Sequence, residues 1–127
     1  MKVILTGDLF LGGDLLNKSS ASIVNSKTFK CADKRIVNLE QPISESEHVA
    51  DKCTLYTGSF ATEQLKQLGI SAVNLAHNHI QDKTDEGILE TVEHLDNAGI
   101  GHFGAGQNIF AAREPYWIDS TTCILGY

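Results

Sequence analysis

The sequence has 127 residues, of which 42% are hydrophobic, so it can bury one modest core and we predict a single domain over residues 1–127. Its 10 Lys and Arg residues against 16 Asp and Glu residues give a formal charge of -6. No basic run is present that could follow a phosphate backbone, which argues against a nucleic-acid partner.

Targeting signals and cysteine usage narrow the class of protein further. No apolar segment approaches membrane-spanning length, and the N-terminus reaches a charge too soon for a signal peptide. Cys31, Cys53 and Cys123 are widely spaced and contain no Cys-x-x-Cys pair, so neither a disulfide framework nor a zinc knuckle is indicated. These features favour a soluble, cytoplasmic protein.

Two predicted strands in the first third of the chain end in a carboxylate. The apolar run of residues 3–6 breaks just before Asp8. Residues 35–40 repeat the pattern and end in Glu40, and Pro42 stops the strand from continuing. Asp8 and Glu40 could therefore converge at one sheet edge, although Glu40 taken alone could equally be a solvated strand end.

The segments around these strands carry weaker signals. Gly12 and Gly13 would allow a close backbone approach to an anionic ligand, but a plain turn is the simpler interpretation. Residues 21–24 predict at most a short helix, and His48 lies in a predicted surface loop.

Two predicted helices follow, and both end in a glycine followed by isoleucine. Thr62 is the expected N-cap of the first helix and Gly69 its C-terminal residue. Thr84 caps the second helix and Gly99 closes it. In the second helix, the apolar stripe expected to face the protein core consists of Ile88, Leu89, Val92 and Leu95.

Short apolar strands alternate with these helices. Residues 70–76 and 100–103 each follow a helix directly, which is typical of βαβ units, and residues 116–119 and 123–127 predict a terminal hairpin. The expected fold class is therefore α/β with a mainly parallel sheet.

The end of the strand over residues 70–76 carries the densest chemistry in the sequence. The polar groups that follow its apolar run are His77, Asn78, His79 and Asp82. One such residue would most simply close a turn by bonding the backbone, but several together favour a metal or proton-transfer site. Since carboxyl ends of parallel strands meet at one edge, we expect Asn78 to lie near the two carboxylates, with the turn beginning by about Asn78.

These motifs carry a family resemblance over nearly the whole chain. In order they are Gly7-Asp8, Asn38-Leu39-Glu40-x-Pro42, Asn74-Leu75-Ala76-x-Asn78-His79-x-x-Asp82 and Gly104-Ala105-Gly106-x-Asn108. The chain resembles the capsule synthesis protein CapA family (poly-γ-glutamate biosynthesis) of the calcineurin-like metallophosphoesterase superfamily, whose fold is a layered α/β sandwich.

The resemblance implies roles for five residues. Asp8, Glu40 and Asn78 would bind metal, His79 would protonate a leaving group or hold the reacting oxyanion, and Asp82 would orient His79. The cofactors would be two divalent ions, Mn²⁺, Zn²⁺ or Fe, that share a bridging water.

The implied function is a metal-dependent hydrolase of a phosphoester or an amide, linked to capsule synthesis. The substrate would be a phosphoester or an anionic polymer. The alternative is a non-catalytic component that binds polymer or acts as a scaffold in capsule assembly.

The sequence departs from the family at three positions and in extent. His77 stands where the family usually has Asn, and Lys83-Thr84 where it has Tyr-Gly. The resemblance covers the N-terminal part of the catalytic domain, and the later metal histidines are not in this sequence. We therefore expect the isolated chain to be inactive, to bind metal weakly, and to self-associate through an unprotected edge strand at residues 123–125.

Overall fold

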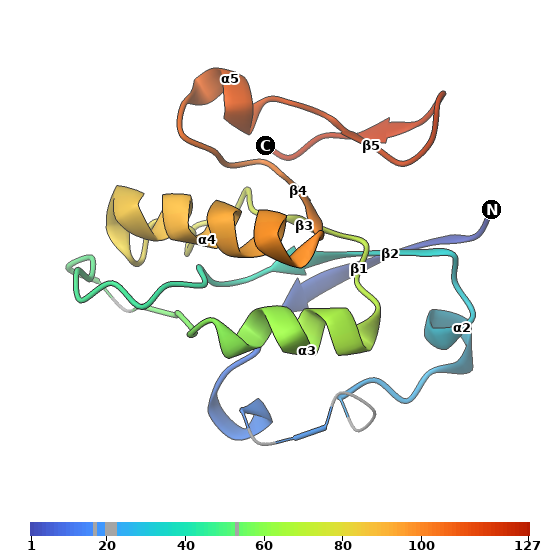
Figure 1. Cartoon of the computed structure of the whole chain (residues 1–127), viewed down its shortest axis with the longest axis horizontal. Coiled ribbons are helices and arrows are strands. Elements are labelled where there is room, and N and C mark those ends of the chain that lie inside the picture. Colours follow the sequence, from blue (N-terminus) through green and yellow to red (C-terminus); the bar gives the residue numbers. More distant parts are fainter. Residues whose placement is uncertain (17, 20–22, 53) are drawn as a thin grey trace.

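The computed structural model describes residues 1–16, 18–19, 23–52 and 54–127 (Figure 1). The expected short helix at residues 21–24 lies partly outside these residues, and Cys53 lies outside them. In chain order the elements are β1 (Val3–Leu9), the 3-10 helix η1 (Gly13–Leu15), α2 (Lys27–Lys30), β2 (Lys34–Leu39), α3 (Phe60–Leu68), β3 (Ala72–Asn74), α4 (Thr84–Ala98), β4 (Gly101–Phe103), α5 (Ile109–Ala112), β5 (Tyr116–Trp117) and β6 (Cys123–Ile124).

The predicted parallel sheet is confirmed. Four strands lie in the order β1-β2-β3-β4, and each neighbouring pair is parallel. The expected break after residue 6 is wrong, because β1 continues through Asp8 to Leu9 with an irregular register between Leu5 and Asp8. The shift lets the strand bend while it keeps pairing with β2, so Asp8 lies within the strand and opposite Asn38.

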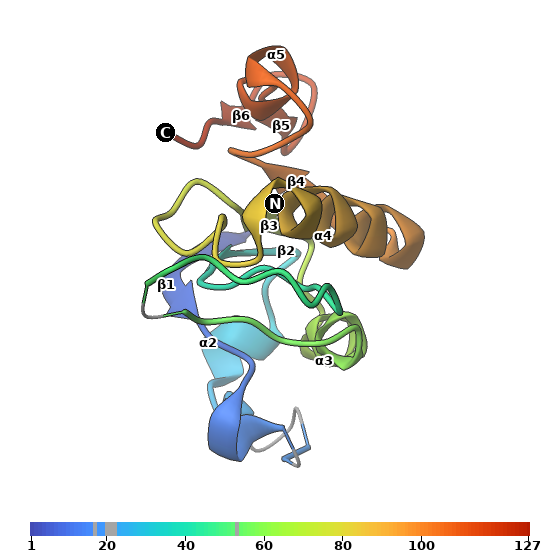
Figure 2. The same ribbon diagram turned by 90° about the vertical axis from the view of Figure 1, so that its left-hand side faces the viewer.

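Side-chain alternation along the strands gives the sheet two different faces. Val37 and Val73 point to the face covered by α3 and α4, where they join the main core with Leu65 and Leu95 (Figure 2). On the opposite face a smaller cluster forms from Ile36, Ala72 and Phe103, packed against Tyr116, Ile118 and Ile124 of the C-terminal hairpin. The sheet is therefore fully covered by helices on one side only.

The ends of α3 and α4 confirm part of the sequence prediction. Gly69 and Gly99 both take the left-handed conformation at the C-terminus, with φ of 68° and 69°. The predicted N-cap Thr62 is wrong: it lies inside α3, where its hydroxyl donates to the Ser59 carbonyl at 2.7 Å. Thr84 is the first helical residue of α4 rather than its cap, and its φ is 61°.

Two further expectations concern the buried stripe of α4 and the terminal hairpin. Leu89 was expected in the buried stripe of α4, yet half of its surface is exposed, because that side of the helix faces solvent. The predicted hairpin is confirmed, but β6 pairs antiparallel with β5 in a separate two-stranded sheet. Residues 123–124 are therefore an edge strand of this small sheet and do not belong to the parallel sheet, whose outer strands are β1 and β4.

Within the described residues, no helix combines the length and the apolar character needed to cross a lipid bilayer.

Candidate functional site

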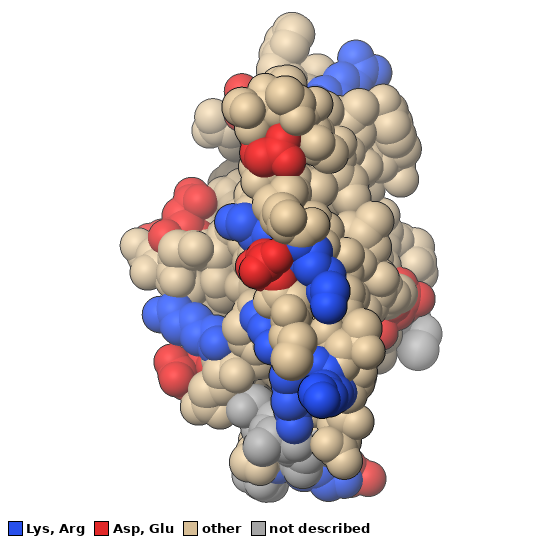
Figure 3. Space-filling model, turned by 90° about the vertical axis from the view of Figure 1, so that its right-hand side faces the viewer, with Lys and Arg blue, Asp and Glu red and all other residues tan. Residues whose placement is uncertain are grey.

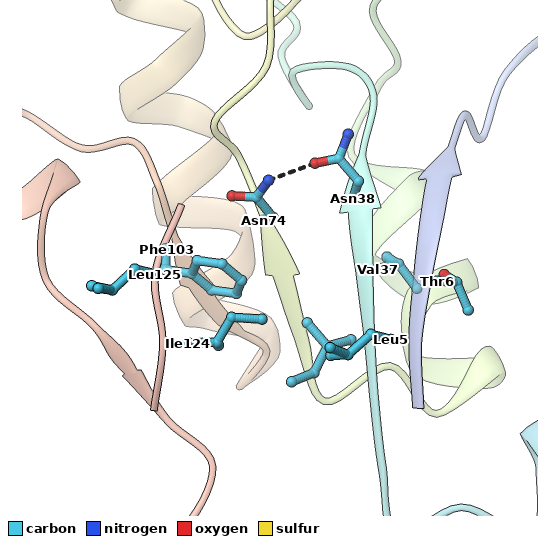
Figure 4. A pocket seen from close by; sticks show the side chains of 9 residues that line it. Leu5, Thr6, Val37, Asn38, Asn74, Phe103, Ile124 and Leu125 are labelled. Atoms are coloured by element: carbon cyan, nitrogen blue, oxygen red, sulfur yellow. Dashed lines mark hydrogen bonds between the residues drawn. The ribbon is translucent and has the colours of Figure 1, made fainter. Parts of the chain in front are cut away.

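Side chains from three neighbouring strands form a polar row at the carboxyl end of the sheet. Asp8, Asn38 and Asn74 are paired in register on β1, β2 and β3. Asn38 Nδ2 donates to Asp8 Oδ1 at 2.5 Å. Asn74 Nδ2 donates to Asn38 Oδ1 at 2.7 Å, as Figure 4 shows. Asn74 Oδ1 then accepts the backbone N–H of Ala76 at 3.1 Å. This chain of bonds fixes the Asp8 carboxylate and the start of the loop after β3.

The carboxyl groups of Asp8 and Glu40 lie within hydrogen-bonding reach of each other. The amide of Asn38 and then Glu40 lower the pKa of Asp8. The pKa of Glu40 is raised, first by the hydrogen bond to Asp8 and then by burial and charge repulsion. The two carboxylates repel each other, so a cation bound between their oxygens would be favourable.

His77 organises the turn that follows β3. Its Nδ1 accepts the backbone N–H of His79 at 3.1 Å, so the ring is an acceptor on that side. Burial, with a further contribution from His79, lowers the pKa of His77 below its usual value. The imidazole of His77 thus accepts a backbone N–H two residues ahead, as the side chain of an Asn can do in a turn.

His79 and Asp82 form a tight pair on the same turn. His79 Nδ1 lies 2.6 Å from Asp82 Oδ2, and the Asp82 side chain is completely buried while that of His79 is 18% exposed. The backbone N–H of Leu55 donates to Asp82 Oδ2 at 2.6 Å. Burial alone would raise the pKa of Asp82, but the bonds from Lys52, Leu55 and His79 outweigh it and lower that pKa.

Lys52 is a site residue that sequence reasoning missed. Its Nζ lies 2.6 Å from Asp82 Oδ1 and donates to the Asn78 carbonyl at 2.7 Å. The same loop adds a third contact, from the Ala50 N–H to the Asp82 carbonyl at 3.0 Å. Lys52 lies in a surface loop without periodicity, about one helix and one strand before its partners, so no local signal could have identified it.

The other predicted residues are placed as follows. Asn78 is exposed in the turn after β3. His79 acts electrostatically on Glu40, and His77 on Asp8 and Asp82, so these groups share one edge of the sheet.

Two further histidines make contacts outside the site, and the surface position predicted for His48 is confirmed. His48 pairs with Glu86 on the surface at 2.8 Å, and His102 lies 3.1 Å from Asp96.

The donor set fits a hard divalent cation in part. The paired carboxylates supply oxygens that such ions prefer, and the repulsion between them makes a positive charge favourable at this place. Among the described residues, however, no three His, Cys, Asp or Glu side chains gather closely enough to hold a metal. The chain therefore presents two carboxylates with open coordination positions beside a histidine and aspartate pair.

One known protein family is similar to the chain over nearly its whole length. The family model described as bacterial capsule synthesis protein PGA_cap matches residues 2–126. No curated protein matches the chain.

Proposed function

The chain belongs to the bacterial capsule synthesis protein family PGA_cap, and from this membership we propose that it forms part of a metal-dependent hydrolase of a phosphoester or an amide. The family has the metallophosphoesterase-like fold and implies a part in capsule synthesis. The observation that carries the proposal is the Asp8 and Glu40 carboxyl pair, which shares one edge with the pair formed by His79 and Asp82.

Asp8 and Glu40 would hold the metal, with the exposed amide of Asn78 as a third oxygen donor. A bound pair of Mn²⁺, Zn²⁺ or Fe ions would supply an activated water and neutralise charge on the reacting group. Asn38 keeps Asp8 ionised and aimed at this position through its bond of 2.5 Å. The chain's own contribution is thus a fixed set of oxygen donors at the end of the sheet.

His79 would act as the general acid. Because its Nδ1 is bonded to Asp82, the proton available to a substrate is the one on Nε2. Asp82 fixes the tautomer and orientation of the imidazole, and Lys52 holds Asp82 in place from the other side. The leaving group would receive its proton from an imidazole ring whose orientation is fixed by Asp82.

Metal titration of the purified chain tests the metal site. We expect weak binding of Mn²⁺ by calorimetry, since the described donors are few, and Asp8→Asn or Glu40→Gln should weaken it by about tenfold or more. Asp119→Asn, a carboxylate in the β5 to β6 turn, is the matched control and should have no effect. Equal binding by all variants would place the metal elsewhere.

The acid role is tested in a form of the protein that hydrolyses a phosphodiester. His79→Ala should lower kcat by about 10²-fold, the scale of a lost general acid, while His77→Ala should do far less. Equal losses would mean that the wrong imidazole has been assigned.

One observation favours the second candidate, a non-catalytic polymer-binding component. Although the chain is acidic overall, Lys and Arg side chains gather on the end opposite the carboxylate pair (Figure 3). Lys27 and Lys30 lie on α2, Lys34 at the start of β2 and Lys66 in the last turn of α3. Arg35 ties these elements together by donating to the carbonyls of residues 30 and 69, at 2.6 Å and 3.0 Å. This basic end could contact an anionic polymer by charge alone.

Charge reversal separates the two candidates. Lys27→Glu with Lys30→Glu should abolish salt-sensitive binding of poly-glutamate if the basic end binds polymer, while Arg113→Glu near α5 should not. Polymer binding that survives this change would remove the support for the second candidate.

A further inference from the structure

A cavity of about 360 Å³ lies beside the loop between β2 and α3, and none of its lining residues belongs to the site described above. Lys83 and Tyr56 line it, together with Ser44 and with Gly12 and Gly13 from the loop after β1. From the groups set out below we propose that this cavity binds a monoanionic carboxylate group through the Lys83 ammonium.

Lys83 is a buried cation without a carboxylate partner. The residue is only 5% exposed, its Nζ donates to the Ser46 carbonyl, and it lies 3.9 Å from the centre of the Tyr56 ring. No carboxylate of the described residues lies within ion-pair distance, in contrast to Lys52, which pairs with Asp82. An ammonium has three N–H donors, so one carbonyl and one ring face leave donor capacity for an anion.

The cavity offers further donors and room near this ammonium. Ser44 Oγ accepts the backbone N–H of Ser46 at 3.1 Å, which leaves the Ser44 hydroxyl proton free for a ligand. Gly13 has a φ of +56°, and a Cβ added there would meet nothing within 4 Å, so the backbone faces open space. The glycine pair therefore leaves room for a ligand to approach the backbone in the cavity that Lys83 also lines.

Glu45 in the same lining decides the charge of the ligand. Its Oε1 accepts the Ser59 N–H at 2.9 Å, so the carboxylate is held at the start of α3 rather than on Lys83. A dianion such as phosphate would meet this negative charge with only one lysine to offset it. A carboxylate carries half that charge and needs fewer donors, so it fits the cavity better.

The test titrates the ¹⁵N-labelled chain with sodium acetate and follows amide shifts, with sodium chloride at equal ionic strength as the reference. We expect saturable shifts at Gly12, Gly13 and Gly58, which line the cavity. Lys83→Met, which keeps the apolar stem, should weaken acetate binding by about tenfold or more. Lys66→Met, on the exposed end of α3, should leave it unchanged.

A second variant keeps the test decisive if Lys83→Met fails to fold. Glu45→Gln retains the acceptor for Ser59 and removes the competing charge, so it should strengthen acetate binding severalfold. Chloride shifts equal to those with acetate, tighter binding of inorganic phosphate than of acetate, or unchanged affinity in Glu45→Gln would each overturn the proposal.

Discussion

At the residue scale, Asp82 connects three parts of the candidate site. Its carboxylate accepts from His79, from Lys52 and from the Leu55 N–H, and its carbonyl accepts from the Ala50 N–H. The contact with His79 was predicted from the family resemblance and is present. The contacts from the loop before α3 could not, because they depend on how a segment without regular structure folds back over the turn.

Replacing Asp82 should therefore cost stability in a way that depends on pH. Asp82→Asn turns an amide N–H₂ toward existing donors and leaves Lys52 without its charge partner, so we expect a loss of about 1–3 kcal/mol at pH 7. The folded pKa of Asp82 lies below its ordinary value of 3.8. The stabilisation is thus complete above about pH 4 and is lost as the pH falls through the folded pKa.

Urea denaturation at pH 7 and near pH 3 measures this effect. The difference between wild type and Asp82→Asn should shrink at the lower pH, and Asp14→Asn, at an exposed carboxylate on η1, shows how much of the change is general. A difference that grows on acidification would contradict the lowered pKa.

At the element scale, the sequence predicts what local patterns determine. The apolar runs and the Gly-Ile exits of both helices locate β2, β3 and β4 and the ends of α3 and α4, because side-chain periodicity and left-handed glycines act locally. The convergence of Asp8 with Glu40 follows from the same patterns. The row through Asn38 and Asn74 was not predicted, since it depends on the register between strands.

The start of α4 carries a residue that the backbone does not favour. Thr84 has a φ of 61°, a conformation that suits glycine and disfavours a β-branched side chain. We expect Thr84→Gly to raise the free energy of unfolding by about 1 kcal/mol, since relief of backbone strain exceeds the entropy cost of glycine.

Thermal and urea unfolding of matched variants measures this strain. Thr62→Gly, inside α3 with ordinary helical backbone, should lower stability by about 1 kcal/mol. If both glycine variants were destabilised equally, the turn before α4 would not be strained by Thr84.

At the scale of the whole molecule, the two faces of the sheet are covered unequally. Helices α3 and α4 cover one face, while the C-terminal hairpin covers the other only near β3 and β4 (Figure 2). On β1, Leu5 is 61% exposed and lines an apolar hollow with Ile36 and Leu125. Among the described strands β1 has a partner on one side only, so its backbone and its apolar face are both open to another chain.

The open β1 edge predicts self-association at β1, in addition to the association expected at residues 123–125. Leu5→Lys places a charge on this edge and face and should shift the chain toward monomer, without loss of stability because the side chain is largely exposed. Leu89→Lys makes the same change at a leucine of similar exposure on α4 and should leave association unchanged. Sedimentation velocity over a range of concentrations measures both, with reductant present because Cys31 and Cys123 are exposed thiols. Association that persists in Leu5→Lys but falls in Leu89→Lys would place the contact on the helical face instead.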